Sequence, residues 1–210
     1  ERFGVDPGRV RSVPHGLPEL DSGTGEDELR ARYDLRGDVV LYPTITYPHK
    51  DHVTLVRAFG RVATGRDATL VLTGGQASAE ADVAAAIRSS GASGRIRRTG
   101  AVPRADVVGL LDMASIVAVP SRYEGFGIPA LEAMARGRAV VVSDAAALPE
   151  VVGDGGVVVH AGDVDAWAEH LAELLDDPGR RTALGDAGRR RARVFSPEHN
   201  LAATLDAHRL

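Results

Sequence analysis

The 210-residue sequence has no cysteine, a single lysine and few aromatic residues. Without cysteine the chain can form no disulfide framework, no thiol nucleophile and no thiolate metal site. Because Phe, Trp and Tyr together make up only 4% of the chain, Ala, Val and Leu have to build the core. No apolar run approaches the roughly 20 residues that cross a bilayer, and no secretory signal pattern is visible. We therefore expect a cytoplasmic protein.

The sequence also lacks an excess of positive charge. It has 25 basic and 29 acidic residues and a formal net charge of -4, whereas a dedicated nucleic-acid binder usually has a basic excess. The one basic run, residues 189–193, follows a segment rich in acidic residues, so we expect a solvated helix face there. No nucleic-acid partner is expected.

What the sequence does have is enough apolar residues, 44% of the chain, for one large folded domain. From residue 38 onward, short β-branched runs alternate with helical patterns, and such runs are typical of parallel strands covered on both faces. The alternation predicts an α/β fold with a doubly wound, Rossmann-like parallel sheet. Strands are expected at residues 39–42, 69–72, 116–119, 139–142 and 157–159, with a weaker one at 95–97. Helices are expected at residues 54–63, 79–90, 104–114, 129–136, 165–175, 179–194 and 197–210.

Glycine and small polar residues are concentrated where these strands end. The segments are residues 43–50, 73–75, 99–103, 120–127 and 143–144. In such a sheet, ligands bind outside the carboxyl ends of the strands, and glycines there expose backbone N–H donors. The loop 124–128 leads into a helix whose N-terminus suits a phosphate, although tight packing alone would also explain its glycines. G-x-G-x-x-G is absent, so an NAD-type fingerprint has no support. The pattern predicts an anion and nucleotide site.

Two carboxylates belong to this rim, Glu124 in the loop and Glu132 in the following helix. A pair of carboxylates can hold vicinal hydroxyls, such as those of a ribose and a sugar. The plainer alternatives are a solvated loop charge for Glu124 and, for Glu132, an ion pair with Arg136 four residues later. The residues alone leave both alternatives open.

Lys50 is the only lysine among 24 arginines. A retained lysine suggests a need for a compact ammonium group. Because Lys50 follows the first strand, this group can neutralise a pyrophosphate at the rim. The alternative is that one surface lysine has survived by chance. His49 and His52 flank it, but Asp51 is the only carboxylate nearby, so no metal site is expected.

Residues 120–135 resemble the signature block of retaining glycosyltransferases of family 4, which have the GT-B fold. The segment reads Pro-Ser-Arg-Tyr-Glu-Gly-Phe-Gly-Ile-Pro-Ala-Leu-Glu-Ala-Met-Ala. The E-x7-E spacing is kept between Glu124 and Glu132. Further blocks agree in the family's order, at residues 13–16, 98–102, 148–154 and 195–197. The resemblance covers nearly the whole chain and indicates the C-terminal, donor-binding half of a GT-B glycosyltransferase.

The resemblance implies two Rossmann-like domains, of which the C-terminal one holds the nucleotide-sugar donor and the N-terminal one supplies most of the acceptor site. By this likeness the isolated chain is inactive without its N-terminal half, through which any peripheral membrane contact would be made. A short strand near residues 10–13 resembles the end of that half. The expected divisions are 1–18, the end of the N-terminal domain and hinge; 19–37, a polar linker and a helix leading into the domain; 38–195, the nucleotide-sugar domain; and 196–210, a helix that crosses back.

Carried over residue by residue, the resemblance places Glu124 on hydroxyls of the donor sugar and Glu132 on the nucleotide ribose. Lys50 would compensate the charge of the diphosphate leaving group, so that Glu124 and Lys50 are the expected catalytic residues. The other expected donor-binding residues are Gly125, Phe126, Gly127, Ile128, Gly74, Val102 and Ser121. The family transfers the sugar of a UDP- or GDP-type donor with retention, by front-side displacement, without an obligatory metal or other cofactor. Catalysis would rest on stabilising the departing charge and orienting the acceptor.

One position departs from the family's pattern. An arginine usually stands five or six residues before the lysine as a second phosphate clamp, and Ile45 and Thr44 occupy those places here. Either another donor, such as His49 or Arg122, takes over or phosphate binding is weaker.

Two other functions remain open from the sequence. One is a nucleotide-sugar 2-epimerase of similar architecture, which lacks this E-x7-E block, and the other is a nucleotide or sugar-phosphate binding module without turnover. The base, the sugar and the acceptor are not specified by the sequence.

Overall fold

A computed structural model describes residues 4, 6, 10, 11, 13–17 and 21–208 of the chain. The described residues form a sheet of six parallel strands in the order β3-β2-β1-β4-β5-β6. This is the order of a doubly wound Rossmann-like sheet, and it confirms the predicted fold class. The strands are β1 (Asp38–Pro43), β2 (Ala68–Thr73), β3 (Ile96–Gly100), β4 (Ile116–Val119), β5 (Ala139–Ser143) and β6 (Val157–Val159).

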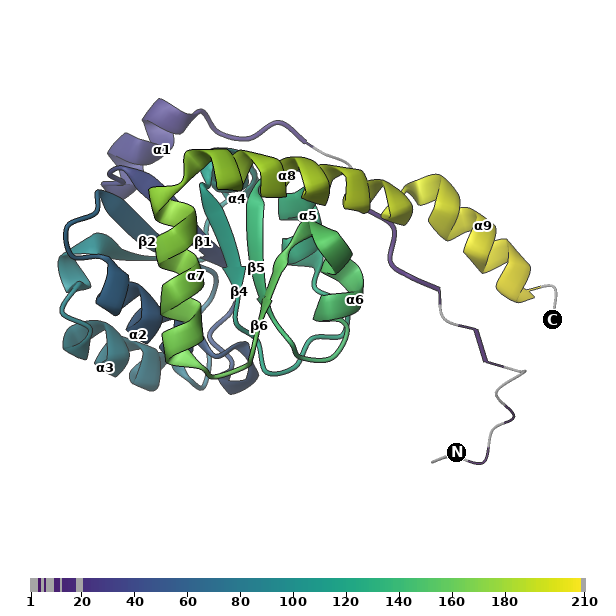
Figure 1. The fold of residues 1–210 in the computed structure, drawn as a ribbon, viewed down its shortest axis with the longest axis horizontal. Helices are drawn as coiled ribbons and strands as arrows, with labels where there is room; N and C mark the ends of the chain where they lie inside the picture. The colour runs from purple at the N-terminus through teal and green to yellow at the C-terminus, as the bar shows by residue number, and fades with distance from the viewer. Residues whose placement is uncertain (1–3, 5, 7–9, 12, 18–20, 209–210) are drawn as a thin grey trace.

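Helices cover both faces of the sheet (Figure 1). On one face α2 packs against α3 and α7, and on the other α4 packs against α1 and α5. Helix α8 runs across the amino ends of β4 and β5, and α9 continues from it away from the body of the domain (Figure 1). The helices are α1 (Glu26–Tyr33), α2 (His52–Val62), α3 (Glu80–Ser89), α4 (Arg104–Met113), α5 (Ile128–Ala135), α6 (Leu148–Val152), α7 (Val164–Asp176), α8 (Pro178–Ala192) and α9 (Pro197–His208).

The core is aliphatic, as the shortage of aromatic residues requires. Every residue of β2, β4 and β5 is buried, which is why these strands have continuous apolar sequences instead of alternating ones. The edge strand β3 is half-buried over most of its length, and this accounts for its weak sequence signal. Trp167, Tyr42 and Phe59 are the largest side chains that are fully buried.

The sequence predicts a polar linker and a helix over residues 19–37, and this region contains helix α1, which begins at Glu26. The buried carboxylate of Asp106 on α4 fixes this segment because it accepts hydrogen bonds from Thr24 Oγ1 at 2.6 Å, Arg32 Nη1 at 2.6 Å and Tyr33 OH at 2.5 Å. The three donors lower the pKa of Asp106 to about 2.

Residues 14–17 lie against the segment that leads into α9. Leu17 N–H donates to Phe195 O at 2.6 Å, and Asn200 donates to Pro14 O. The predicted strand at residues 10–13 includes Ser12, which lies outside the described residues, and its described members are in no strand. Helix α6 was not predicted. None of the helices in the described part of the chain is long and apolar enough to span a membrane.

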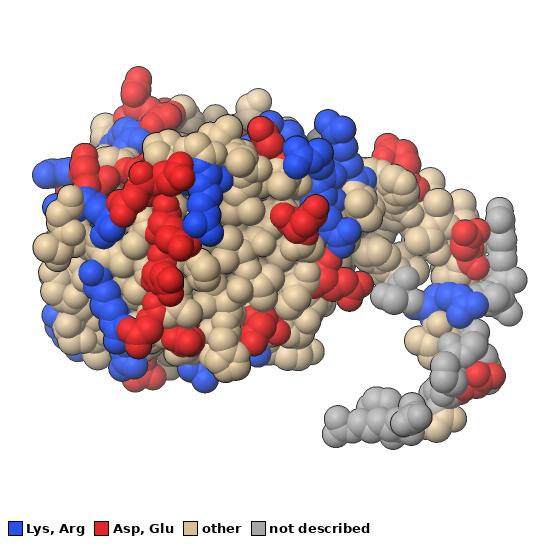
Figure 2. All heavy atoms as spheres, viewed as in Figure 1, with Lys and Arg blue, Asp and Glu red and all other residues tan. Residues whose placement is uncertain are grey.

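The basic run at residues 189–193 is only in part a solvated face. Figure 2 shows acidic side chains in a stripe over α7 and basic side chains gathered over the C-terminal part of α8. Arg189 donates to Arg136 O at the end of α5, and Arg191 donates to Glu150 O and Val151 O of α6. Cations at such carbonyl ends stabilise helix termini. These two arginines therefore hold α8 against its neighbours.

Candidate functional site

The centre of the sheet contains a topological switch point. After β1 the chain continues to β2, and after β4 it continues to β5 on the other side, so the loops that follow β1 and β4 diverge. Ligands bind in the crevice that this divergence leaves. Lys50 follows β1 and Glu124 follows β4, and their side chains meet there, with Lys50 Nζ 2.7 Å from Glu124 Oε1. The two residues predicted to be catalytic thus form an ion pair at the switch point.

Two buried hydroxyl groups support this ion pair. The OH of Tyr42 lies 2.9 Å from Lys50 O and 2.8 Å from Ser121 Oγ, and Ser121 Oγ lies 2.8 Å from Glu124 Oε1. The hydroxyl groups of Tyr42 and Ser121 have one proton each, so two protons serve the three contacts. Because a carboxylate is the strongest of the acceptors, Ser121 donates to Glu124, and Tyr42 divides its proton between the other two oxygens. Burial also raises the pKa of Tyr42 well above its usual value, so the phenol stays protonated.

Sequence reasoning included Ser121 and missed Tyr42. Tyr42 stands inside a buried strand, where its apolar ring is enough to explain it. No sequence signal distinguished a tyrosine that only packs from one whose hydroxyl contacts Lys50 O and Ser121 Oγ beside an ion pair. The role of Tyr42 follows from its hydrogen bonds alone.

The glycine-containing loop leads from β4 into α5. Gly127 has a φ of 98°, and a Cβ there would stand 2.6 Å from Leu148 Cδ2. Glycine is therefore required at this position. The N-terminus of α5, beginning at Ile128, lies at the carboxyl end of the sheet, where its backbone N–H groups suit an anion.

The predicted donor residue Phe126 is turned toward the ends of the chain. Its ring lies 5.3 Å from the ring of His15 and 5.5 Å from that of Phe195. The structure does not bring the Phe126 ring to Lys50 and Glu124, so only the backbone of Phe126 belongs to the rim. Neighbouring Gly125 has open space where a Cβ would stand.

Glu132 is buried in α5 and forms an ion pair with Arg104, not with Arg136. Arg104 Nη2 lies 2.5 Å from Glu132 Oε1, and Arg104 Nη1 lies 3.4 Å from Oε2. Arg136 follows the end of α5 and reaches Asp112 at 2.5 Å instead. Arg136 is the C-cap of α5, with φ -84° and ψ 0°, so it lies outside the regular helix in which the i,i+4 rule holds. The hydrogen bond to Glu132 raises the pKa of Arg104 further.

Gly74 and Val102 come together in a pocket of about 330 Å³ at the carboxyl ends of β1, β2 and β3. Gly74 has a φ of 135°, and a Cβ there would stand 2.3 Å from Thr44 O, so no other residue fits. The remaining lining residues are Pro43, Thr44, Ile45, Thr73, Ala101 and Val107. The pocket is mostly apolar, as sites for planar ring systems are.

Among the described residues that line this pocket, none is a cation that could take the place of the absent arginine. Thr44 and Ile45, which stand at the two positions where the resemblance predicts it, line the wall. His49 stacks on the ring of Tyr47 at 5.7 Å, and Arg122 Nε binds Asp51 at 2.9 Å. Neither of the two candidates for its replacement lines the pocket.

His52 is buried beside the ring of Tyr42, with 4.7 Å between the ring centroids. Burial and the nearby Arg98 lower the pKa of His52 to about 4, so its imidazole is neutral at physiological pH. Across the described ranges no group of three or more His, Asp or Glu side chains could hold a metal ion.

Comparison with known proteins agrees with this geometry. The family described as "Glycosyl transferases group 1" matches residues 27–191, from α1 to the last turn of α8. The chain belongs to this family. Its matched region contains Lys50, Gly74, Val102, Glu124 and Glu132, so the residues singled out above all lie within the family's own domain.

Curated and solved relatives support the same assignment. The MMP alpha-(1->4)-mannosyltransferase of Mycolicibacterium hassiacum is 34% identical over 97% of this chain and 49% of its own length. Sucrose-phosphate synthase from Thermosynechococcus elongatus has a TM-score of 0.77 and 26% identity over 95% of this chain and 52% of its own. HepE of Anabaena, solved with UDP and glucose, shares the fold with a TM-score of 0.78 and 22% identity, covering 90% of this chain and 54% of its own. The chain thus spans about half the length of the relatives it matches.

Proposed function

We propose that this chain is the donor-binding half of a retaining glycosyltransferase of family 4, which transfers a sugar from a nucleoside diphosphate to an acceptor. The observation that carries the proposal is the meeting of Lys50 and Glu124 at the switch point, beside the N-terminus of α5. A cation next to a carboxylate, at a helix N-terminus, matches a donor that joins a diphosphate to a polyhydroxylated sugar.

The nucleotide would be held by three parts of the rim. The base would occupy the pocket of Gly74 and Val102, and the ribose diol would bind Glu132. Arg104 contacts both oxygens of Glu132, and each oxygen keeps a second lone pair that can accept a hydrogen bond from a ribose hydroxyl. The diphosphate would lie between Lys50 and the N–H groups of Gly127 and Ile128. UDP is the first candidate nucleotide, since the structural relative HepE was solved with UDP.

The chemistry would depend on Lys50 and Glu124. The bond between the anomeric carbon and the diphosphate oxygen breaks, and an acceptor oxygen bonds to the same face of the sugar while its proton passes to the departing phosphate. Lys50 stabilises the charge on that phosphate, and Glu124 orients the sugar through its hydroxyls. One N–H of Lys50 faces Glu124, and the ammonium group has two further donors for the phosphate. We propose that no metal or other cofactor takes part, which predicts that the full-length enzyme keeps its activity in EDTA.

The acceptor would come from a second domain. Helix α9 is without buried residues in its described length, and Leu201 and Leu205 are 58% and 49% exposed on one side of it. Such an exposed apolar pair fits a helix that packs against another domain. We propose that residues 1–18 and 196–210 connect the donor domain to the acceptor half.

Calorimetric titration of the chain with UDP, GDP and ADP, each with and without an attached hexose, tests the proposal. We expect one nucleotide to bind in preference. Glu132→Ala should weaken the free nucleotide, whereas Glu124→Ala should weaken mainly the sugar-bearing form. Glu169→Ala, an exposed acid on α7, is the matched control and should change neither.

Two results would overturn parts of the proposal. No binding of any nucleotide at about millimolar concentration would reject the donor site. Wild-type binding by both site variants would reject the residue assignments. Release of a 2-epimerised sugar from the donor without an acceptor would favour the epimerase.

A further inference from the structure

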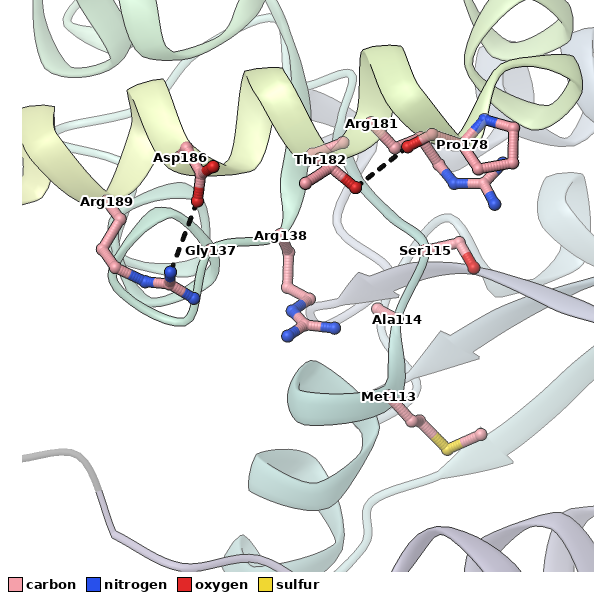
Figure 3. A pocket seen from close by; sticks show the side chains of 11 residues that line it. Met113, Ala114, Ser115, Gly137, Arg138, Pro178, Arg181, Thr182, Asp186 and Arg189 are labelled. Atoms are coloured by element: carbon pink, nitrogen blue, oxygen red, sulfur yellow. Dashed lines mark hydrogen bonds and ion pairs between the residues drawn. The ribbon is translucent and has the colours of Figure 1, made fainter.

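A second pocket lies at the opposite, amino-terminal ends of the strands (Figure 3). It has a volume of about 380 Å³ and is bounded by α8, the end of α4 and the turn that follows α5. The donor rim is at the carboxyl ends of the same strands, so an occupant of this pocket would not touch the donor. The lining residues with side-chain charges or hydroxyls are Ser115, Arg138, Arg181, Thr182, Asp186 and Arg189.

Arg138 is the unusual residue of this pocket. Its Nε donates to Arg136 O at 3.1 Å, but within the described ranges neither of its terminal nitrogens has an acceptor. The residue is half-buried, and every other half-buried arginine of those ranges donates from a terminal nitrogen to a carboxylate or a backbone carbonyl. Figure 3 shows its guanidinium between the end of α4 and α8. The two terminal nitrogens of Arg138 therefore face the pocket as a planar pair of donors, without an acceptor among the described residues.

The other two arginines already have partners. Arg181 donates to the carbonyls of Leu174 and Leu175 and lies 3.2 Å from Asp38. Arg189 donates to Arg136 O and lies 3.5 Å from Asp186. Compensation of helix C-termini explains the contacts with backbone carbonyls, including that of Arg138 Nε, and ion pairing explains the contacts with Asp38 and Asp186. Both leave the terminal nitrogens of Arg138 unexplained.

The charges that line the pocket favour an anion. Its lining has three guanidinium groups and one carboxylate, and the dashed contact in Figure 3 joins that carboxylate to Arg189 at the long distance of 3.5 Å. A guanidinium fork matches a phosphate group with two parallel hydrogen bonds. The oxygens of Asp186, Thr182 and Ser115 can accept hydrogen bonds from hydroxyl groups. The volume is that of a small-molecule site.

We propose that this pocket binds a small phosphorylated polyol, such as a monosaccharide phosphate, with its phosphate on Arg138 and its hydroxyls toward Asp186. The bound molecule is held by residues of α8 and of the turn between α5 and β5. It is separate from the donor site, so both ligands bind at the same time.

Titration with ribose 5-phosphate in saturating UDP tests this assignment. Wild-type chain should bind one molecule, and Arg138→Gln should weaken binding by about tenfold or more, as expected for the loss of a charged bidentate contact. Arg57→Gln, an exposed arginine on α2, is the matched control and should change the affinity less than about twofold. Neutral ribose should not bind, and inorganic phosphate should bind more weakly than ribose 5-phosphate.

The proposal is overturned by no binding at about 10 mM, by equal binding to Arg138→Gln, or by displacement of ribose 5-phosphate by UDP. Vesicles of phosphatidylcholine containing phosphatidic acid test whether a lipid phosphate is the ligand instead. If the chain sediments with these vesicles in a way that depends on Arg138 but does not bind ribose 5-phosphate, the proposal is also overturned.

If the variant does not fold, amide chemical shifts of the wild-type chain decide the question. Ligand should then move the signals of Ser115, Gly137 and Ala139, and unchanged signals reject the site. Failure of UDP to bind would affect the proposed function and leave this result standing.

Discussion

Replacing Lys50 by methionine removes the ammonium group 2.7 Å from Glu124 Oε1 and keeps most of the side-chain length. The side chain of Glu124, which is 9% exposed, then keeps its hydrogen bond from Ser121 as its one side-chain partner among the described residues. Removing one partner costs about 3–5 kcal/mol for a buried ion pair, whereas an exposed pair contributes about 1 kcal/mol at most. With Lys50 17% exposed, we expect the free energy of unfolding to fall by an intermediate amount, about 2 kcal/mol.

Urea and thermal unfolding at neutral pH measure this effect. In a domain of this size, about 2 kcal/mol lowers Tm by roughly 4–8 °C. The double variant Lys50→Met, Glu124→Gln removes both charges of the pair, so it should recover at least half of the lost free energy of unfolding. The same Lys50→Met chain should bind a nucleoside diphosphate about tenfold more weakly and with less salt dependence, while the nucleoside alone binds as before.

Two results would refute this reasoning. If Lys50→Met unfolds like the wild type, the ion pair does not stabilise the fold. If it binds the nucleoside diphosphate like the wild type, Lys50 does not face the phosphates. A double variant as unstable as the single variant would show that the loss comes from packing of the lysine stem.

Three further predictions concern other parts of the fold. Gly74→Ala should lower the free energy of unfolding by more than about 1 kcal/mol, because a Cβ would stand 2.3 Å from Thr44 O, and wild-type stability in urea would contradict this. The pKa of His52 is about 4 when folded and 6.5 otherwise, so only the unfolded chain takes up a proton between these values. Stability should therefore fall by about 3 kcal/mol as pH drops from 7 to 4, and His52→Gln should remove this part of the slope. The pKa of Asp106 is lowered to about 2, so its contribution of about 2 kcal/mol to the free energy of unfolding is present above pH 4 and is lost on acidification. Asp106→Asn should therefore unfold at a lower urea concentration. An unchanged urea midpoint would contradict the role of Asp106 in fixing α1.

The strands and the rim were predictable because their causes are local. Continuous apolar runs such as β4 and β5 arise from burial on both faces, and the order of strands and helices then determines which loops meet. Lys50 and Glu124 could be placed on one rim from this reasoning, although 74 residues separate them in the sequence.

The partners of the site residues were not predictable in the same way. Arg104 and Glu132 are 28 residues apart, and no spacing rule connects residues of two neighbouring helices, whereas the i,i+4 rule pointed to Arg136. Tyr42 looked like any buried strand residue, and Arg138 stood out only when the other arginines of the described chain were found to have partners. Helix α6 is five residues long, too short for a periodic apolar pattern.

A crystal structure of this chain with its preferred nucleoside diphosphate tests the central claim most directly. We predict the base in the pocket of Gly74 and Val102, the ribose hydroxyls on Glu132, and the diphosphate in contact with Lys50 Nζ at the N-terminus of α5. A nucleotide bound at the amino ends of the strands, or one whose diphosphate lies away from Lys50 and α5, would contradict the assignment of the donor site.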